Sequence, residues 1–195
     1  MEKEINRWYK KLWETKGARF IAANRLELHD KWSTITISIV SVYIISLNLT
    51  IILPNRTTLL SEMNITFSTI CLSVLVLVVS LILASKNYKM RADKYHECGR
   101  KINEIYDKIC LWKNTEQLPS NEELQKISTE YYKILDNYEN HTRLDYLMFM
   151  CNNRSEYNIK FKGIFVFYIN FRYYLHTVGG YLLVLLIPLL VYLIA

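Results

Sequence analysis

The amino-acid sequence predicts an all-α integral membrane protein with three transmembrane helices, an N-terminal amphipathic helix and a cytosolic antiparallel helical hairpin. Residues 32–53, 63–85 and 173–195 contain no Asp, Glu, Lys or Arg. Each stretch is about as long as the roughly 20 residues that a helix needs to cross the hydrocarbon core of a bilayer. The remaining sequence is rich in charge. A soluble domain of 195 residues that buried three such stretches would have too little amphipathic sequence left to cover them.

The distribution of basic residues predicts the orientation of these helices. Of the 24 Lys and Arg residues, eight lie in residues 1–31 and fifteen in residues 86–172, while Arg56 is the one in the loop 54–62. Cytoplasmic segments of membrane proteins carry the excess of Lys and Arg. We therefore expect a multi-pass protein whose N-terminus and residues 86–172 are cytoplasmic. The same rule accounts for the net charge of +6, so direct nucleic-acid binding is not expected.

The first 31 residues form the predicted amphipathic helix. Ile5, Trp8 and Leu12 follow one another at helical spacing and give the segment one apolar face among many basic residues. Such a helix can lie on the anionic cytoplasmic leaflet, or it can pack on the cytosolic helices of the same protein. The sequence favours neither arrangement over the other. The transmembrane hairpin is expected to follow, over residues 32–85.

Residues 86–150 form the predicted cytosolic hairpin. We expect the helix of the second span to continue into it without a break, to turn at residues 113–121 and to return as far as Met148. Ser120 followed by Glu123 is the pattern of a capping box, which marks the start of the returning helix. The seam residues, which are candidates for a regulatory surface, are Tyr95, Ile102, Ile109, Ile127, Ile134 and Tyr138.

The last part of the chain is predicted to contain a connector and the third span. Residues 151–162 are polar, and residues 163–171 contain four aromatic side chains typical of a membrane interface. The connector and this interfacial aromatic segment together occupy residues 151–172, and the C-terminal transmembrane helix occupies residues 173–195. Gly179 and Gly180 in that helix permit a bend or a close helix contact.

Polar residues form a stripe on each of the first two spans. At 100° per residue, the stripe residues of one span fall within about 80° of one another on the helix surface. The candidate pore-lining or packing residues are Thr34, Ser38, Ser41 and Asn48 in the first span and Thr66, Thr69, Ser73 and Ser80 in the second. Small polar residues either hydrogen-bond across packed helices or line a water-filled path in an oligomer. Both interpretations remain open at this point.

The sequence contains no recognisable signature of catalysis. Motifs for nucleotide phosphates, zinc proteases and serine hydrolases are all lacking, and the spans hold no Asp, Glu, Lys or Arg, which ion-coupled transport normally needs. The four cysteines contain no CxxC pair, and the histidines do not cluster with them. We therefore expect no catalytic residue, no metal site and no cofactor, with the cysteines reduced.

Several short motifs carry a resemblance to a known family. They are KGARFIAANRL at 16–26, Trp32-Ser33, Ser41-Val42-Tyr43, VSLI at 79–82, YKMRADKYHEC at 88–98 and Ile105-Tyr106. In this layout the chain resembles the SLATT domains, two-span membrane effectors of bacterial conflict systems, and it is most similar to their fifth subfamily. The likeness covers roughly residues 10–150, so the third predicted span is additional to the two-span description.

The resemblance implies an effector of anti-phage defence in the bacterial inner membrane. Such an effector is silent until infection is sensed, and it then oligomerises or opens and stops growth. Its expected partners are membrane lipid, further copies of itself and a cytosolic sensor such as a reverse transcriptase or a nucleotide-second-messenger synthase system. The alternative is a non-conducting scaffold or receptor that recruits a cytosolic partner through residues 86–150.

Overall fold

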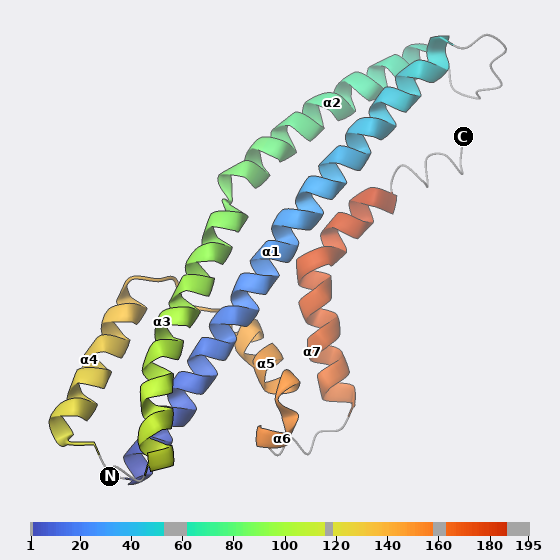
Figure 1. Cartoon of the computed structure of the whole chain (residues 1–195). Helices are drawn as coiled ribbons and strands as arrows, with labels where there is room; N and C mark the ends of the chain where they lie inside the picture. The colour runs from blue at the N-terminus through green and yellow to red at the C-terminus, as the bar shows by residue number, and fades with distance from the viewer. Residues whose placement is uncertain (1, 53–61, 116–118, 158–162, 187–195) are drawn as a thin grey trace. The chain divides into compact units, whose positions relative to one another are not determined.

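The described part of the protein is helical. A computed structural model describes residues 2–52, 62–115, 119–157 and 163–186, and within these ranges it contains helices and short links with no strand. The helices, shown in Figure 1, are α1 (Glu2–Ile52), α2 (Glu62–Ser85), α3 (Tyr88–Thr115), α4 (Asn121–Asp136), α5 (Arg143–Asn152), α6 (Arg154–Tyr157), α7 (Ile164–Tyr174) and the π-helix η1 (Leu175–Gly179).

The chain divides into two compact units. The first unit, called here the polar unit, comprises Met1–Glu27 and Lys89–Tyr173. The second, called here the apolar unit, comprises Leu28–Tyr88 and Tyr174–Ala195. These boundaries lie close to the ends of the charge-free stretches of the sequence, so the division follows the segregation of charge along the chain.

One core of the polar unit joins the start of α1 to α3 and α4. In Figure 1 α4 runs antiparallel to α3, and both lie beside the N-terminal part of α1. The buried residues of this core are Ile5, Trp8, Leu12, Cys98, Ile102, Ile105, Ile109, Leu124, Ile127 and Tyr131. Leu12 is completely buried, and the rings of Trp8 and Tyr131 meet edge to face with centroids 5.6 Å apart. The apolar face of the N-terminal segment therefore packs on α3 and α4 rather than facing outward.

A second core of the polar unit joins α5 to α7. Its buried residues are Met148, Cys151, Val166, Ile169 and Tyr173, and Ile21 of α1 packs against them. The returning helix of the hairpin was expected to run as far as Met148, and that expectation is wrong, because α4 ends at Asp136. A new helix, α5, begins after Thr142 with its own capping box.

Two capping signals explain where these helices begin. Ser120 caps α4, with its side chain accepting from the Glu123 amide while the Glu123 carboxylate accepts from the Ser120 amide. The capping box predicted from the sequence is thus confirmed. Thr142 and Asp145 make the equivalent exchange at the start of α5. Each box satisfies backbone donors that the first turn of a helix otherwise leaves without partners.

The expected continuous helix from the second span into the hairpin is interrupted. α2 ends at Ser85 and α3 begins at Tyr88, and between them Asn87 has a φ of +49°. Asn tolerates this left-handed conformation better than most residues, and here its side-chain amide donates to the Ser85 carbonyl at 3.3 Å. The local break thus has a specific residue at its centre.

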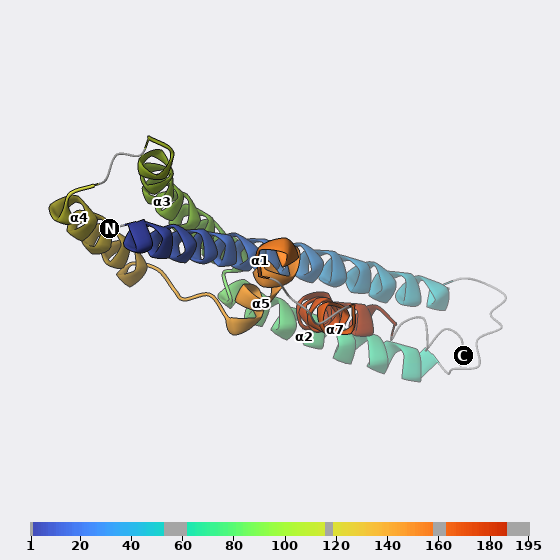
Figure 2. The ribbon, with the colours of Figure 1, turned by 90° about the horizontal axis from the view of Figure 1, so that it is seen from below.

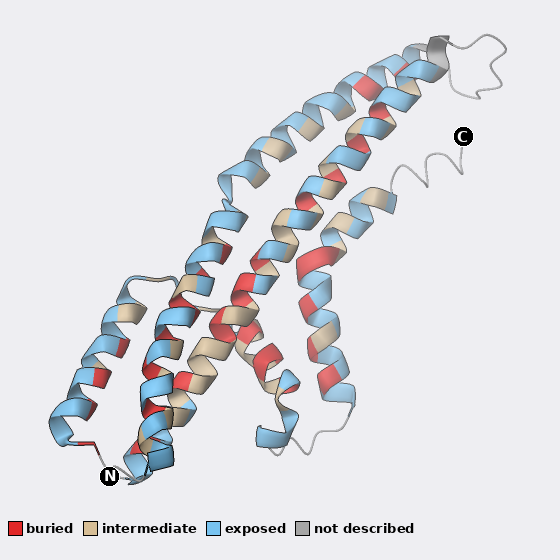
Figure 3. Ribbon diagram, in the orientation of Figure 1, coloured by how far each residue is buried: buried red, intermediate tan, exposed pale blue. Residues whose placement is uncertain are grey.

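The apolar unit contains the C-terminal part of α1 and α2, which lie side by side in both Figure 1 and Figure 2. Two described stretches, Glu2–Leu49 and Met63–Thr115, each contain a window long and apolar enough to cross a membrane. Only 6% of the window in the second stretch is buried, and α2 is accordingly mostly pale blue in Figure 3. A core helix of a soluble protein would be mostly buried, so this exposed apolar surface indicates a helix that crosses a membrane.

The C-terminal helix starts earlier than predicted. α7 begins at Ile164 and passes directly into η1, and the helical conformation continues to Leu186. The predicted boundary between an interfacial segment and a span at residues 172 and 173 therefore has no counterpart in the backbone. The remaining residues of the predicted third span, 187–195, lie outside the described residues.

Candidate functional site

The polar stripe of α1 lies mainly on the exposed side of the helix. Thr34 and Ser38 are exposed and Ser41 is half-buried. Each hydroxyl donates to the carbonyl one turn earlier in its own helix, at 3.0, 2.9 and 2.8 Å respectively. The buried residues of the same segment form a different line, namely Ser33, Thr36, Val40 and Ile44. The first three stripe residues therefore do not hold α1 to the rest of the chain.

Asn48 and Thr69 connect the two stripes. The Thr69 hydroxyl is buried and donates to the Asn48 side-chain oxygen at 3.1 Å, while the Asn48 amide donates to the Ile44 carbonyl. Thr66 and Ser73 are exposed, and Ser80 is half-buried. The hydroxyls of Ser73 and Ser80 bond within α2, each at 2.7 Å. Asn48–Thr69 is thus the contact in which residues of the two predicted stripes meet.

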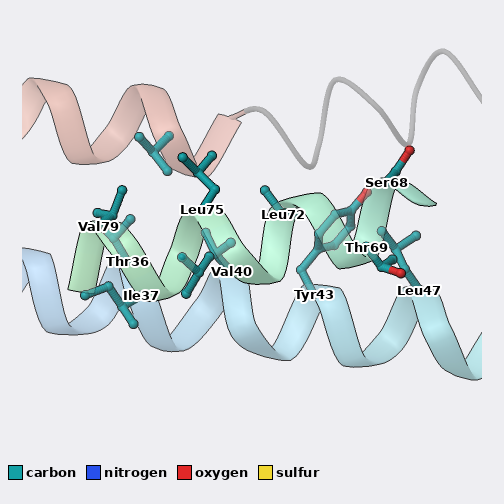
Figure 4. A pocket seen from close by; sticks show the side chains of 12 residues that line it. Thr36, Ile37, Val40, Tyr43, Leu47, Ser68, Thr69, Leu72, Leu75 and Val79 are labelled. Carbon is teal, nitrogen blue, oxygen red and sulfur yellow. The ribbon is translucent and has the colours of Figure 1, made fainter. Parts of the chain in front are cut away.

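A groove runs between α1 and α2 on another side of the pair. Its volume is about 350 Å³, and Figure 4 shows aliphatic side chains and Tyr43 along it. The lining residues are Thr36, Ile37, Val40, Tyr43, Leu47, Ser68, Thr69, Leu72, Leu75, Val76, Val79 and Val184. Most of these residues are aliphatic, so the groove is mainly apolar. Thr69 is the one residue that the groove shares with the predicted stripes, so the other stripe residues lie outside the groove.

The predicted seam residues do not all lie in one place. Ile102, Ile109 and Ile127 are buried in the core formed by α1, α3 and α4, and Ile134 and Tyr138 pack at its edge. Tyr95 is also buried, but its hydroxyl donates to the Asn140 carbonyl at 2.8 Å. It therefore belongs to a neighbouring site that holds the link between α4 and α5.

That neighbouring site contains buried charges. Arg25 of α1 donates through Nε and Nη2 to the two carboxylate oxygens of Asp145, at 2.7 and 3.1 Å, and Asp145 is completely buried. Arg19, six residues earlier in α1, is also completely buried, and its Nη2 donates to the Asn140 side-chain oxygen at 3.0 Å. The Tyr95 ring lies 5.6 Å from the Arg19 guanidinium. Two arginines of α1 thus hold the start of α5.

The charge state of this site follows from burial. Burial lowers the pKa of His141, which lies in the same link, and the charge of Arg19 lowers that pKa further, while Asp145 acts in the opposite direction. His141 is therefore neutral near pH 7. Burial alone would lower the pKa of Arg25, but the hydrogen bonds that Arg25 donates to Asp145 and the charge of that carboxylate raise this pKa overall.

Aromatic contacts extend this attachment along α1. The Phe149 ring of α5 lies directly over Gly17, where an added Cβ would come within 1.9 Å of the ring. Trp13 meets the same ring edge to face at 4.8 Å. Next to them, the Tyr157 hydroxyl donates to the Glu14 carboxylate at 2.8 Å. Burial and this carboxylate raise the pKa of Tyr157, so the phenol remains a donor at all physiological pH values.

Sequence reasoning missed this charged site, although two signals for it were present. Thr142 and Asp145 have the spacing of a capping box, which predicts a helix start at that point. Arg19 and Arg25 both lie within the motif at 16–26 that carries the family resemblance. The pairing of Arg25 with a residue 120 positions away is a tertiary contact, and no local pattern predicts it.

Comparisons with known proteins add one finding. A family model described as SMODS and SLOG-associating 2TM effector domain family 5 matches residues 1–194. Neither the curated proteins nor the solved structures gave a match.

In the described parts of the chain, no three His, Cys, Asp or Glu side chains lie close enough together to hold a metal ion.

Proposed function

The chain belongs to the SMODS and SLOG-associating 2TM effector domain family 5, and we propose that it is the membrane effector of a bacterial anti-phage system. In this proposal it remains silent until a cytosolic sensor signals infection. Copies of the chain then assemble, and the homo-oligomer forms a pore in the inner membrane or disrupts it. The infected cell stops growing before the phage completes its cycle, which is abortive infection.

The position of Thr34 and Ser38 is the observation that supports a pore most directly. Both are exposed polar residues on a helix segment that is otherwise suited to a membrane, and neither contributes to the buried line of α1. A face that one chain leaves uncovered is available to a neighbouring copy or to a water-filled path. Hydroxyl groups keep water in a narrow passage, whereas aliphatic side chains favour its dewetting.

The proposal includes a third crossing of the membrane. The family description names two transmembrane segments, whereas the C-terminal region contributes a further apolar helix, described as far as Leu186. With the N-terminus and residues 86–172 in the cytoplasm, a third crossing would place the C-terminus outside. The third helix would then anchor α7, and through it α5, at the cytoplasmic surface.

The polar unit would receive the signal, and no catalytic role is proposed for it. The family description names the associated SMODS and SLOG domains, which is consistent with a separate cytosolic sensor as the partner. Neither a bound cofactor nor nucleic acid is needed in this account. A nucleotide-second-messenger synthase system or a reverse transcriptase would supply the signal, and the effector would respond through contacts made by the polar unit.

Leucine substitutions in the stripe test the proposed pore. In the double variant Thr34→Leu, Ser38→Leu we expect dye entry and growth arrest to be lost while the oligomer keeps its size on a native gel. Ser46→Leu is the matched control, because Ser46 is also exposed and bonds to its own helix, at 2.9 Å. It lies about 120° around the helix from Thr34 and so outside the stripe.

A second pair of substitutions tests whether the contact between α1 and α2 serves packing rather than conduction. Asn48→Leu with Thr69→Val removes the hydrogen bond between α1 and α2, which is worth about 0.6 kcal/mol in a membrane. We expect this variant to weaken the hairpin and reduce the yield of oligomer, with activity falling in proportion. If the Thr34, Ser38 variant instead retains full dye entry with normal assembly, the stripe is not a conducting surface and the proposed pore is wrong. A chain that assembles normally and never admits dye would be a scaffold.

A further inference from the structure

The attachment of α5 to α1 contains one buried cation without a carboxylate partner. Arg19 is completely buried, and Nη2 is the atom with the bond to Asn140. Nε and Nη1 are buried and have no hydrogen-bond partner among the residues that the structure describes. A guanidinium taken out of water loses its hydration, and each buried donor without an acceptor adds to the cost. The closed arrangement therefore carries an internal cost at this residue.

The groups around Arg19 are concentrated in one short link. Residues 137–142 connect α4 to α5, and Asn140 in this link accepts bonds from both Arg19 and Tyr95. At its end, the Asp145 carboxylate accepts from the Thr142 amide at 2.9 Å and the Thr142 hydroxyl at 2.7 Å as well as from Arg25. The link and the first turn of α5 are therefore held on α1 by two arginines. Arg25 stabilises this contact through its ion pair, whereas the buried charge of Arg19 destabilises it.

The two arginines act in opposite senses. The Arg25–Asp145 pair is bidentate and well bonded, so separating it would leave two buried charges without partners. Arg19, in contrast, gains hydration as soon as the link moves away. The balance between them sets how easily the link opens, and a small difference in free energy is enough to change the population of an open state severalfold.

Movement of α5 has a direct path to the membrane helix. α5 shares a core with α7 through Met148 and Cys151 on one side and Val166, Ile169 and Tyr173 on the other. α7 passes directly into η1 and the helical residues up to Leu186. If α5 leaves α1, α7 loses part of its packing. An event at the link is thus transmitted along a continuous helix.

We propose that residues 137–142 and α5 form an autoinhibitory latch, which Arg25 and Asp145 hold closed and which the buried Arg19 makes ready to open. The proposal rests on the function proposed above and names how that effector is kept silent. It predicts that the two arginines respond to substitution in opposite directions. A purely structural role for both would make either substitution weaken the same contact.

Hydrogen exchange of the full chain in lipid nanodiscs tests the latch without reference to any trigger. Arg19→Met keeps an unbranched apolar stem and removes the buried charge. We therefore expect the exchange rate of the α5 amides to fall by a factor of about five or more. Asp145→Asn leaves Arg25 without its anionic partner, and there exchange should rise about fivefold or more. Arg91→Met is the matched control, because its ion pair with Glu139 of the same link is partly exposed, and its exchange should not change.

Growth arrest under a titratable promoter supplies the second readout. Arg19→Met should need a higher level of expression than the unchanged chain to arrest growth, Asp145→Asn a lower level, and Arg91→Met the same level. Faster exchange in Arg19→Met would overturn the proposal, because Arg19 would then be a simple structural cation. Exchange that shifts as expected with unaltered arrest thresholds would also overturn it, since the latch would not regulate. Should Asp145→Asn fail to fold, Arg19→Met and its control still decide the matter.

The two proposals can fail separately. If the unchanged chain admits no dye and arrests no growth at any expression level, the proposed effector function is wrong. The opposite exchange rates of the Arg19 and Asp145 variants would still be measured in the nanodiscs. If the unchanged chain is active and the exchange rates do not diverge, the latch is wrong and the effector function stands.

Discussion

At the scale of single residues, Gly17 allows the Phe149 ring to pack directly on α1. The Phe149 ring covers it so closely that any side chain larger than hydrogen would overlap the ring. The same ring meets Trp13, and Tyr157 stacks on Trp13 with centroids 5.8 Å apart. The aromatic side chains of α5 and α6 are therefore arranged around one glycine of α1, and a single methyl group there would disturb all of them.

Gly17→Ala should destabilise the attachment of α5. Because the added Cβ would lie 1.9 Å from the Phe149 Cε2 atom, the ring must move, at a cost of about 1–3 kcal/mol. The measurement is the rate of limited proteolysis between α4 and α7 in the full chain, which should rise. Gly180→Ala is the control, since no atom lies within 4 Å of the position of its Cβ. Equal effects of the two changes would show that Phe149 does not need Gly17.

At the scale of elements, α3 is an amphipathic helix with one buried face and one exposed face. Ile102, Ile105 and Ile109 are completely buried at spacings of three and four residues, while Leu111 on another face is 63% exposed. α4 is held to it by the same core and begins at a well-formed cap. The resulting cluster with the start of α1 is a small three-helix core whose stability depends on a few aliphatic side chains.

Aspartate substitutions along this core should have graded effects. Ile102→Asp places an unpaired carboxylate at a completely buried position and should lower the free energy of unfolding of the polar unit by about 3–5 kcal/mol. Ile134→Asp, at a half-buried position, should cost less, and Leu111→Asp should be nearly neutral. Thermal unfolding of the full chain followed by circular dichroism gives the order. If Leu111→Asp were as damaging as Ile102→Asp, the helix would be packed differently.

Ile102→Asp and Ile134→Asp should also disconnect the effector from infection. If the hairpin of α3 and α4 receives the signal, as we propose, its loss should abolish infection-dependent arrest in cells. Leu111→Asp leaves the core intact and should retain that response. Full response in Ile102→Asp and Ile134→Asp would show that the hairpin is not the receiving element.

At the scale of the whole molecule, the segregation of charge determines how the chain relates to the membrane. The polar unit contains nearly all of the charged residues, whereas the described apolar unit exposes large aliphatic side chains along α2. Exposed apolar surface of this extent is stable in lipid and not in water. The boundary between the two units along the chain is therefore expected to coincide with the cytoplasmic surface of the bilayer.

Cysteine labelling tests the orientation and the number of crossings together. In a chain whose four natural cysteines are replaced by alanine, an impermeant maleimide should label Asn55→Cys in intact spheroplasts and label Asn121→Cys only after permeabilisation. Ala195→Cys should behave like Asn55→Cys if the third helix crosses. Labelling of Asn55 and Asn121 to the same extent would overturn the orientation. Protection of Ala195 alone would leave two crossings and overturn the third.

The sequence by itself determined the class of the protein and several of its local features. Uncharged stretches indicate a membrane protein because hydrocarbon does not hydrate charge, and this depends on composition alone. The periodicity of α3 and α4 and the cap at Ser120 are local as well, and they were predictable for that reason. The break at Asn87 and the start of α5 at Thr142 were missed, because continued helical periodicity on both sides concealed them.

The tertiary structure alone decided which of two possible faces is covered. A helix in a membrane can bury Ser33 and Thr36 or Thr34 and Ser38, and composition does not distinguish between lines one or two residues apart. The choice depends on where α2 lies against α1. Likewise, Arg25 meets Asp145 and Arg19 meets Asn140 across about 120 residues of chain, because packing of α5 brings them together. Periodicity reports what a residue's own helix needs, whereas a buried charge needs a partner that only the folded chain can supply.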